Sequence, residues 1–164
     1  MSAKTAITST PGSEHSKSVW LAVMRIYIGA YFIHASLLKF SNSYINGLGV
    51  MLKSWASSTN FQWYQQFLHE QIIPHAKFFA FLTAIGEFCV GIALLLGILS
   101  GLAAMFGLLM NINYFFATSW QGPASQCANL TFIVCELVII FTGAGRTMGF
   151  DKYLSKKILI RYLT

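Results

Sequence analysis

Four long apolar runs divide the chain, and each is close to the length of a membrane-spanning helix. They cover residues 19–40, 78–99, 101–120 and 129–148. A bilayer core is crossed by about 20 apolar residues in a helix. The first run carries Arg25 and ends in Lys39 rather than in a small-residue cleavage site, so we expect a retained helix and not a signal peptide. The pattern therefore predicts four transmembrane helices.

The connection 41–77 between the first two runs is too long for a plain hairpin loop. It has helix-length apolar periodicity mixed with charged and amide side chains, and its aromatic residues include Trp55 and Trp63. Such rings favour the headgroup zone of a membrane. We expect one or two interfacial helices here, turning into the second span at Pro74, with a soluble cap over the bundle as the alternative.

Composition supports a membrane class. The chain has 164 residues, of which 55% are hydrophobic and 10% charged. A water-soluble domain carries about a quarter charged residues. The net charge of +6 comes from basic residues near segment ends and forms no stripe, so no nucleic acid is expected as a partner. The predicted fold class is an all-α integral membrane protein, a four-transmembrane-helix bundle with an interfacial helical connection between helices 1 and 2.

The distribution of basic residues predicts an orientation. One side has Lys4, Lys17, Arg146, Lys152, Lys156, Lys157 and Arg161, and the other has Lys39, Lys53 and Lys77. The positive-inside rule then puts both termini in the cytoplasm and the 41–77 segment outside. We expect a mobile tail over 1–17, a membrane domain over 18–148 and a basic amphipathic cytoplasmic tail over 149–164. Membrane lipids are the expected surroundings.

Ionisable residues inside membrane spans are costly and are candidates for function. They are Arg25, His34, Glu87 and Glu136, with Lys39 and Arg146 near the borders. One helical stripe of the first span contains Arg25, Gly29, Phe32, Ser36 and Lys39. Each of the other three spans has a similar stripe. The stripe of the second span contains Ala80, Ala84, Glu87, Gly91 and Leu94, and that of the third contains Ala104, Gly107, Asn111, Tyr114 and Thr118. The stripe of the fourth span contains Asn129, Glu136 and Gly143. We expect each stripe to face the bundle interior.

Depth along the helices suggests partners for these charges. Arg25 and Glu87 are expected to form an ion pair, with Asn111 donating to Glu87. Glu136 falls at a depth similar to that of His34, which lies on the opposite side of its helix from Arg25 and would face lipid or a partner. The alternative interpretation is that a buried pair of this kind serves only to fix helix register.

No metal site is expected, because the histidines, cysteines and carboxylates lack ligand spacing. A haem held by two histidines would need two of them at span depth, and only His34 qualifies. Of the three cysteines, Cys127 is expected in an outer loop and the other two inside spans. If electrons move here, we expect the acceptor to be a lipid-soluble quinone.

Three segments together resemble the DoxX/DoxD family. They are MRIYIGAYFIHASLLKF, the second and third spans around Gly86-Glu87, and the ending Gly143-Ala144-Gly145-Arg146 with Gly149-Phe150-Asp151. The chain departs from the family at Ser36, where glycine is common. The resemblance implies a four-helix bundle in a prokaryotic cytoplasmic membrane. In the DoxD branch, the small membrane subunit of thiosulfate:quinone oxidoreductase, thiosulfate is oxidised to tetrathionate while quinone is reduced, alongside a second subunit.

This resemblance suggests roles for the polar residues. Lys39 would attract an anion such as thiosulfate at the outer mouth, and Glu87 or Glu136 would pass protons to the quinone. With Arg25, the residues Lys39 and Glu87 form the predicted catalytic set. The residues predicted to bind quinone or another ligand are Glu136, Asn111, Asn129 and His34.

A second interpretation stays open. The chain would then be a non-catalytic accessory subunit of a larger respiratory or photosynthetic membrane complex. Its faces would hold lipid, quinone or pigment, and His34 would ligate a chlorin magnesium from an outward face. A transporter is less favoured, because no broken helix or inverted repeat is visible.

Overall fold

The computed structural model describes residues 11–154, and within that range it is helical and contains no strand. The predicted mobile segment before Pro11 and the basic segment after Leu154 lie outside the described residues. The helices are α1 (Pro11–Lys39), α2 (Asn42–Ser58), α3 (Gln62–Phe67), α4 (Ala76–Leu96), α5 (Ser100–Thr118), α6 (Pro123–Thr142) and α7 (Asp151–Leu154). Short turns of other helix types cover Leu68–Ile72, Ile73–His75, Ser119–Gln121 and Ala144–Arg146.

Four of the described helices are long and apolar enough to cross a membrane, which agrees with the predicted fold class. The candidate spans are Ser18–Lys39, Gln62–Leu96, Ser100–Gln121 and Pro123–Thr142. The second is longer than α4 because α3 and the short turns continue into it. The protein is therefore a multi-pass, all-α membrane bundle.

Helix boundaries differ from the predictions at several points. Helix α1 begins at Pro11, so part of the expected tail is helical. The turn between α4 and α5 falls at Gly97, which has a left-handed φ of 68°, and at Leu99, which has φ 49°. Helix α6 starts at Pro123, well before the predicted Asn129, and Cys127 consequently lies on an exposed helical face instead of in a loop. Proline suits a first helical turn because the N–H groups at this position have no acceptor within the helix, so a residue without an N–H loses no hydrogen bond.

The end of the fourth span was also predicted wrongly. Helix α6 stops at Thr142, because Gly143 takes the left-handed conformation with φ 59°. Glycine reaches this region without steric cost and commonly ends helices. The residues up to Met148, expected inside the span, form a short turn and a loop.

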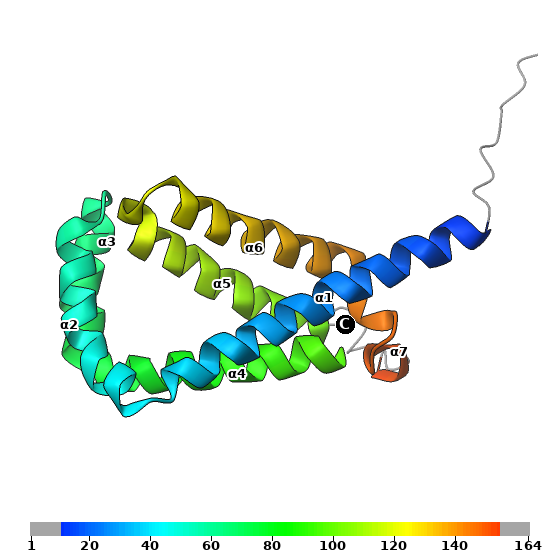
Figure 1. Cartoon of the computed structure of the whole chain (residues 1–164), viewed down its shortest axis with the longest axis horizontal. Helices are drawn as coiled ribbons and strands as arrows, with labels where there is room; N and C mark the ends of the chain where they lie inside the picture. Colours follow the sequence, from blue (N-terminus) through cyan, green and yellow to red (C-terminus); the bar gives the residue numbers. More distant parts are fainter. Residues whose placement is uncertain (1–10, 155–164) are drawn as a thin grey trace, which may run out of the picture.

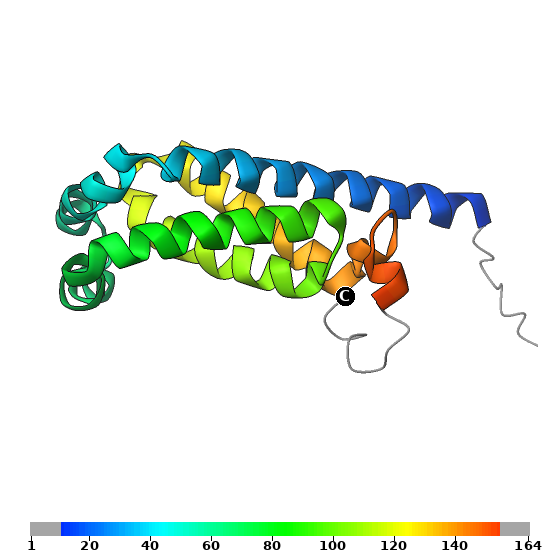
Figure 2. The same cartoon turned by 90° about the horizontal axis from the view of Figure 1, so that it is seen from below.

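The bundle consists of two closely packed pairs, α1 with α4 and α5 with α6 (Figures 1 and 2). Glycines bring α1 and α4 together. A Cβ atom added at Gly29 would lie 2.6 Å from the backbone nitrogen of Leu95, and one added at Gly91 would lie 2.7 Å from Cγ1 of Ile33. We call this contact the glycine seam. It leaves no space for a side chain between the two backbones.

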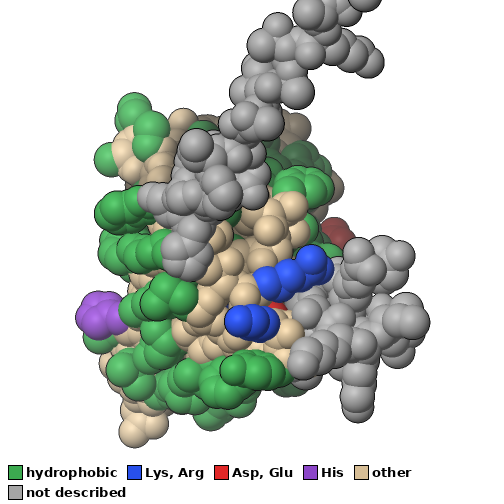
Figure 3. Space-filling view, turned by 90° about the vertical axis from the view of Figure 1, so that its right-hand side faces the viewer, with side chains coloured by type: hydrophobic (Ala, Val, Ile, Leu, Met, Phe, Trp, Pro, Cys, Tyr) green, Lys and Arg blue, Asp and Glu red, His purple; other side chains and the backbone are tan. Residues whose placement is uncertain are grey.

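The two ends of the bundle differ. At one end α2 and α3 lie across the ends of the spans, and we call this the cap end (Figure 1). An apolar cluster holds α2 and α3 against α4 and α5, and it includes Leu48, Leu52, Tyr64, Ala80 and Ala117. The opposite end, called the terminal end, carries the α4–α5 turn and residues 143–154. Figure 3 shows hydrophobic side chains along the left and lower edges of this end and basic side chains nearer its middle.

The predicted inward stripes are confirmed for α1 and α4. Arg25, Gly29, Phe32 and Ser36 are buried, as are all five stripe residues of α4. The outward faces carry exposed large apolar side chains, such as Phe141 and Leu109. The burial pattern is the one expected of a bundle whose surroundings are lipid.

Candidate functional site

A buried charged cluster closes the terminal end. Both Arg25 and Asp151 are fully buried. The guanidinium of Arg25 donates to the carbonyl oxygens of Leu94, at 2.7 Å, and of Met148, at 3.1 Å. Because these carbonyls come from the end of α4 and the loop after α6, Arg25 joins three parts of the chain. The predicted ion pair between Arg25 and Glu87 is therefore wrong.

Asp151 completes this cluster. Its carboxylate accepts hydrogen bonds from the backbone N–H groups of Leu99, at 2.6 Å, and Ser100, at 2.9 Å. These donors belong to the first turn of α5, where N–H groups lack partners within the helix. Asp151 thus caps α5 from a distant segment. The segment after residue 148, expected as an interfacial tail, begins with this buried anchor.

A second cluster lies near the cap end. The ammonium of Lys39 lies 2.5 Å from both carboxylate oxygens of Glu87, and the hydroxyl of Tyr114 donates to Glu87 Oε1 at 2.5 Å. Lys39 Nζ also lies 5.1 Å from the centre of the Tyr114 ring, close enough for a cation–π contact. The partner of Glu87 is thus Lys39, and three helices meet at this carboxylate.

The positions of the two residues in their helices explain this pairing. Lys39 is the last residue of α1, so its long side chain can turn inward under the cap. Glu87 lies in the middle of α4 and is almost fully buried, whereas the Lys39 side chain is 20% exposed. The cation is therefore the member of the pair that reaches the open space beside it.

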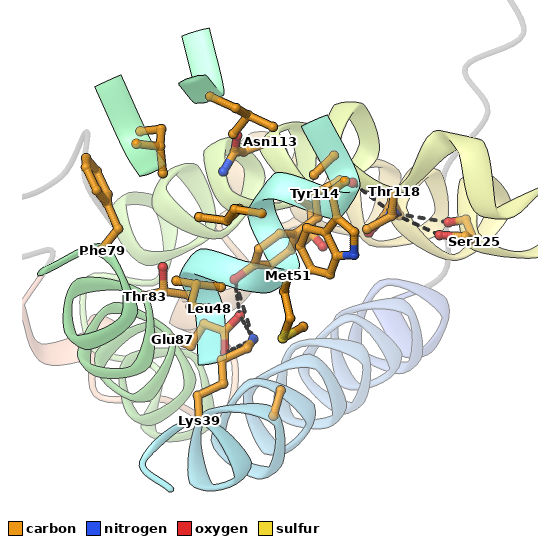
Figure 4. Close-up of a pocket in the computed structure, with 18 of the residues that line it drawn as sticks. Lys39, Leu48, Met51, Phe79, Thr83, Glu87, Asn113, Tyr114, Thr118 and Ser125 are labelled. Carbon is orange, nitrogen blue, oxygen red and sulfur yellow. Dashed lines mark hydrogen bonds and ion pairs between the residues drawn. The ribbon is translucent and has the colours of Figure 1, made fainter. Parts of the chain in front are cut away.

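That open space is a cavity of about 580 Å³ between the cap and the bundle. Figure 4 shows Lys39 and Glu87 on one side and Thr118 and Ser125 on another, with Tyr114, which lies next to Thr118 on α5, joining the two sides through its bond to Glu87. Thr118 Oγ1 accepts hydrogen bonds from Ser125 Oγ, at 2.9 Å, and from Asn129 Nδ2, at 3.1 Å. Most of the remaining lining is aliphatic or aromatic and includes Phe32, Leu48, Met51, Trp55, Phe79 and Phe132. The cavity thus combines an apolar body with two polar groups.

Tyr44, on α2, also lines the cavity. Burial, and next the nearby charge of Glu87, raise the pKa of Tyr44 to about 12. A tyrosine is protonated at neutral pH in any case, and this shift keeps the O–H donor of Tyr44 in place to a higher pH. Sequence reasoning missed Tyr44 as a site residue and treated Tyr114 only as a stripe member, because aromatic residues are abundant in this chain.

Glu136 lies deeper, in a separate pair. It is fully buried, and its Oε1 accepts a hydrogen bond from Asn111 Nδ2 at 2.7 Å. Its other oxygen has no hydrogen-bond partner among the described residues. The prediction that Asn111 donates to Glu87 is wrong, because Asn111 turns toward α6. Asn111 itself still contributes to the cavity wall.

The remaining candidates divide into two groups. Asn129 lines the cavity, as a ligand-binding prediction requires. His34 is exposed on α1 and does not line the cavity, so the structure does not bring it to this site. Within residues 11–154 no three His, Cys, Asp or Glu side chains come together as a metal site would need.

The fold and this site define a multi-pass membrane protein with a largely apolar cavity that carries a few polar groups and lies under a helical cap. A family model for DoxX matches residues 20–120, more than half of the chain. The chain belongs to the DoxX family. The matched region contains Lys39, Glu87 and Tyr114 together with the cap. Searches of curated proteins and of solved structures found no match.

Proposed function

We propose that this protein is the quinone-binding membrane subunit of an oxidoreductase, with the quinone ring held in the cap-end cavity. The observation that carries the proposal is the Lys39–Glu87–Tyr114 cluster on the wall of a largely apolar cavity. Ligand pockets for small molecules have volumes of about 300–1,000 Å³ and place a few polar groups in an apolar lining. The cavity, at about 580 Å³, falls in that range.

The two polar walls suit the shape of a quinone. A para-quinone has carbonyl oxygens at opposite edges of a flat apolar ring. In this proposal one oxygen accepts a hydrogen bond from Lys39 Nζ, the partly exposed cation. The other oxygen faces the hydroxyl and amide groups of Ser125 and Asn129. Aromatic residues such as Trp55 and Phe132 cover the ring faces, where offset stacking is favourable.

The same cluster provides for proton transfer. Reduction of a quinone takes up two electrons and two protons, and the charge on the reduced oxygen grows next to the Lys39 ammonium. Lys39 then gives a proton from Nζ, and its pair with Glu87 holds the ammonium close to the reacting oxygen. Solvent at the cap end reprotonates Lys39, and the second proton passes from solvent to the other quinone oxygen through the hydroxyl of Ser125.

The electrons come, in this proposal, from thiosulfate on a partner subunit. Two thiosulfate ions give up two electrons as they form tetrathionate, which balances one quinone. We assign the anion to the partner because Glu87 already balances the charge of Lys39. With both termini in the cytoplasm of a prokaryote, the cap and the partner lie on the outer side of the membrane.

Quinone binding by the purified protein tests the proposal. A ubiquinone headgroup analogue should quench the fluorescence of Trp55, which lines the cavity. We expect Glu87→Gln to weaken binding about tenfold, which is 1.4 kcal/mol. Glu70→Gln is the matched control, because Glu70 is exposed on the turn before α4 and does not line the cavity.

Two outcomes contradict the proposal. One is a protein that binds no quinone and retains only acyl lipids after purification, which favours the accessory-subunit interpretation. The other is equal quinone binding by Glu87→Gln and the wild type, which would show that the Lys39–Glu87–Tyr114 cluster does not contribute to quinone binding. With a purified partner subunit, thiosulfate-dependent quinone reduction that is lost in Lys39→Ala supports the full reaction.

A further inference from the structure

The cavity extends toward the flank where α1 and α6 face each other. It is lined from α1 by Tyr31 and Ala35, and from α6 by Ala128 and Phe132. Each of these helices packs mainly on another partner, α1 on α4 and α6 on α5. In Figure 1, α1 and α6 lie close near the terminal end and diverge toward the cap end.

Side-chain size decides where this flank is closed. The rings of Tyr31 and Phe132 have centroids 4.4 Å apart and join the two helices. One helical turn nearer the cap, the corresponding positions are Ala35 and Ala128. Two alanines cannot fill the distance that two stacked rings fill. The flank is therefore closed by the ring pair and open above it.

Exposure shows that this opening reaches the outer surface. Tyr31 is 47% exposed and Met51 is 38% exposed, yet both line the cavity. Ala128 is likewise exposed and lines the cavity. Residues that belong to both the cavity wall and the outer surface mark a mouth. Met51 belongs to α2, so the cap also contributes to the exposed part of the cavity wall.

The mouth lies at membrane depth. At a rise of 1.5 Å per residue, Ala128 lies about 8 Å below the start of α6 and Tyr31 about 12 Å below the end of α1. Both helices are candidate spans. A mouth at this level opens toward acyl chains. It therefore suits a lipid-dissolved molecule better than a water-soluble one.

We infer that the gap between α1 and α6 is a lateral portal through which a quinone enters from the bilayer, its isoprenoid tail lying between Ala35 and Ala128. The inference rests on the proposed quinone function and adds the route and the tail site. The alanines provide width for the tail. The Tyr31–Phe132 ring pair forms the floor and keeps the tail at the cavity level.

A blocked portal tests this inference in protein reconstituted in lipid nanodiscs. Ala128→Phe narrows the mouth, and Ala124→Phe is the control, since Ala124 is also exposed on α6 but does not line the cavity. Two probes are used, a long-tailed ubiquinone and its headgroup analogue without a tail. We expect Ala128→Phe to slow association of the long-tailed probe about tenfold and to change that of the tail-free probe less than about twofold.

The outcomes separate the two proposals. Failure of both probes to bind the wild type overturns the quinone function itself. Normal binding of both probes to Ala128→Phe, with unchanged rates, overturns the portal and leaves the function intact. Equal slowing of both probes also overturns the portal, since it indicates general damage to the cavity. Circular dichroism and elution volume identify a misfolded variant, and Ala128→Leu then replaces it.

Discussion

The two ends of the bundle each contain a cation and a buried carboxylate, but the surroundings of these charges differ. At the terminal end, Arg25 and Asp151 bind backbone groups from α4, α5 and the loop after α6. At the cap end, Lys39 and Glu87 bind each other and Tyr114, and the lysine reaches a cavity. Charges bound to backbone stabilise the fold, whereas charges bound to side chains beside a cavity remain available to a ligand.

The largest expected effect on stability comes from the terminal end. Asp151→Ala removes two hydrogen bonds from backbone N–H groups to a charged acceptor and leaves those donors buried. Hydrogen bonds to charged groups contribute about 1.5–3 kcal/mol each, so we expect the loss of both bonds to cost about 3–6 kcal/mol. Thermal unfolding in mild detergent, followed by circular dichroism, measures this loss.

Ser100→Ala is the control for that variant. Ser100 lies beside Asp151, but its buried hydroxyl has no hydrogen-bond partner among the described residues. Its removal should change stability by less than about 0.5 kcal/mol. If Asp151→Ala were as stable as Ser100→Ala, the terminal cluster would not hold the bundle together.

The glycine seam between the two clusters gives the next largest effect. Gly91→Val inserts a side chain where an added Cβ already lies 2.9 Å from the carbonyl oxygen of Gly29. Overpacking of this kind costs about 1–3 kcal/mol. In contrast, Gly47 has open space around it on α2, and Gly47→Ala should stabilise the protein by up to about 1 kcal/mol. Equal melting temperatures for the two variants would show that the seam is loose.

A smaller stability effect is expected at the cap end. Glu87→Gln keeps the shape of the side chain and an acceptor for the Tyr114 hydroxyl, and Lys39 can turn toward the cavity. We expect a loss of about 1 kcal/mol, the net value of a typical hydrogen bond, because the neutral Gln leaves no buried carboxylate unpaired and Lys39 is partly exposed. The same unfolding experiment measures it. A loss as large as that of Asp151→Ala would remove the distinction between the two ends.

The smallest effect is a pH dependence at Tyr44. Its pKa is raised from 10.0 to about 12, so folding favours the neutral phenol. That contribution to stability is complete below pH 10 and is lost as pH rises toward 12. Tyr44→Phe should flatten this part of the curve of melting temperature against pH. If the melting temperature of Tyr44→Phe still fell at alkaline pH as it does in the wild type, another titrating group would be responsible for the fall.

Sequence patterns predicted the four spans and the inward stripes, because both depend only on local periodicity. They did not predict the partners of the charges. Depth estimated along one helix gives no rotation or tilt, so Arg25 and Glu87 appeared closer than they are. The actual partners of Arg25 include backbone carbonyls, which no sequence pattern marks.

The polar start of α6 was hidden for a related reason. Ser125, Gln126 and Asn129 make this segment polar, and the predicted start of the span consequently fell at Asn129 instead of Pro123. In the structure these side chains bond to Thr118 and Ser119 at the end of α5, and two of them line the cavity. A polar site at the beginning of a span therefore resembles a connection in a hydropathy profile.

The cap that Asp151 provides for α5 has a consequence for biosynthesis. The ribosome makes the α4–α5 hairpin well before it reaches Asp151. The first turn of α5 and the guanidinium of Arg25 therefore lack the hydrogen-bond partners that Asp151 and Met148 provide until the last part of the described chain has been synthesised. The hairpin is therefore inserted into the membrane before Asp151 can cap α5. Nascent chains arrested before this residue should remain open to proteases and chaperones until synthesis resumes.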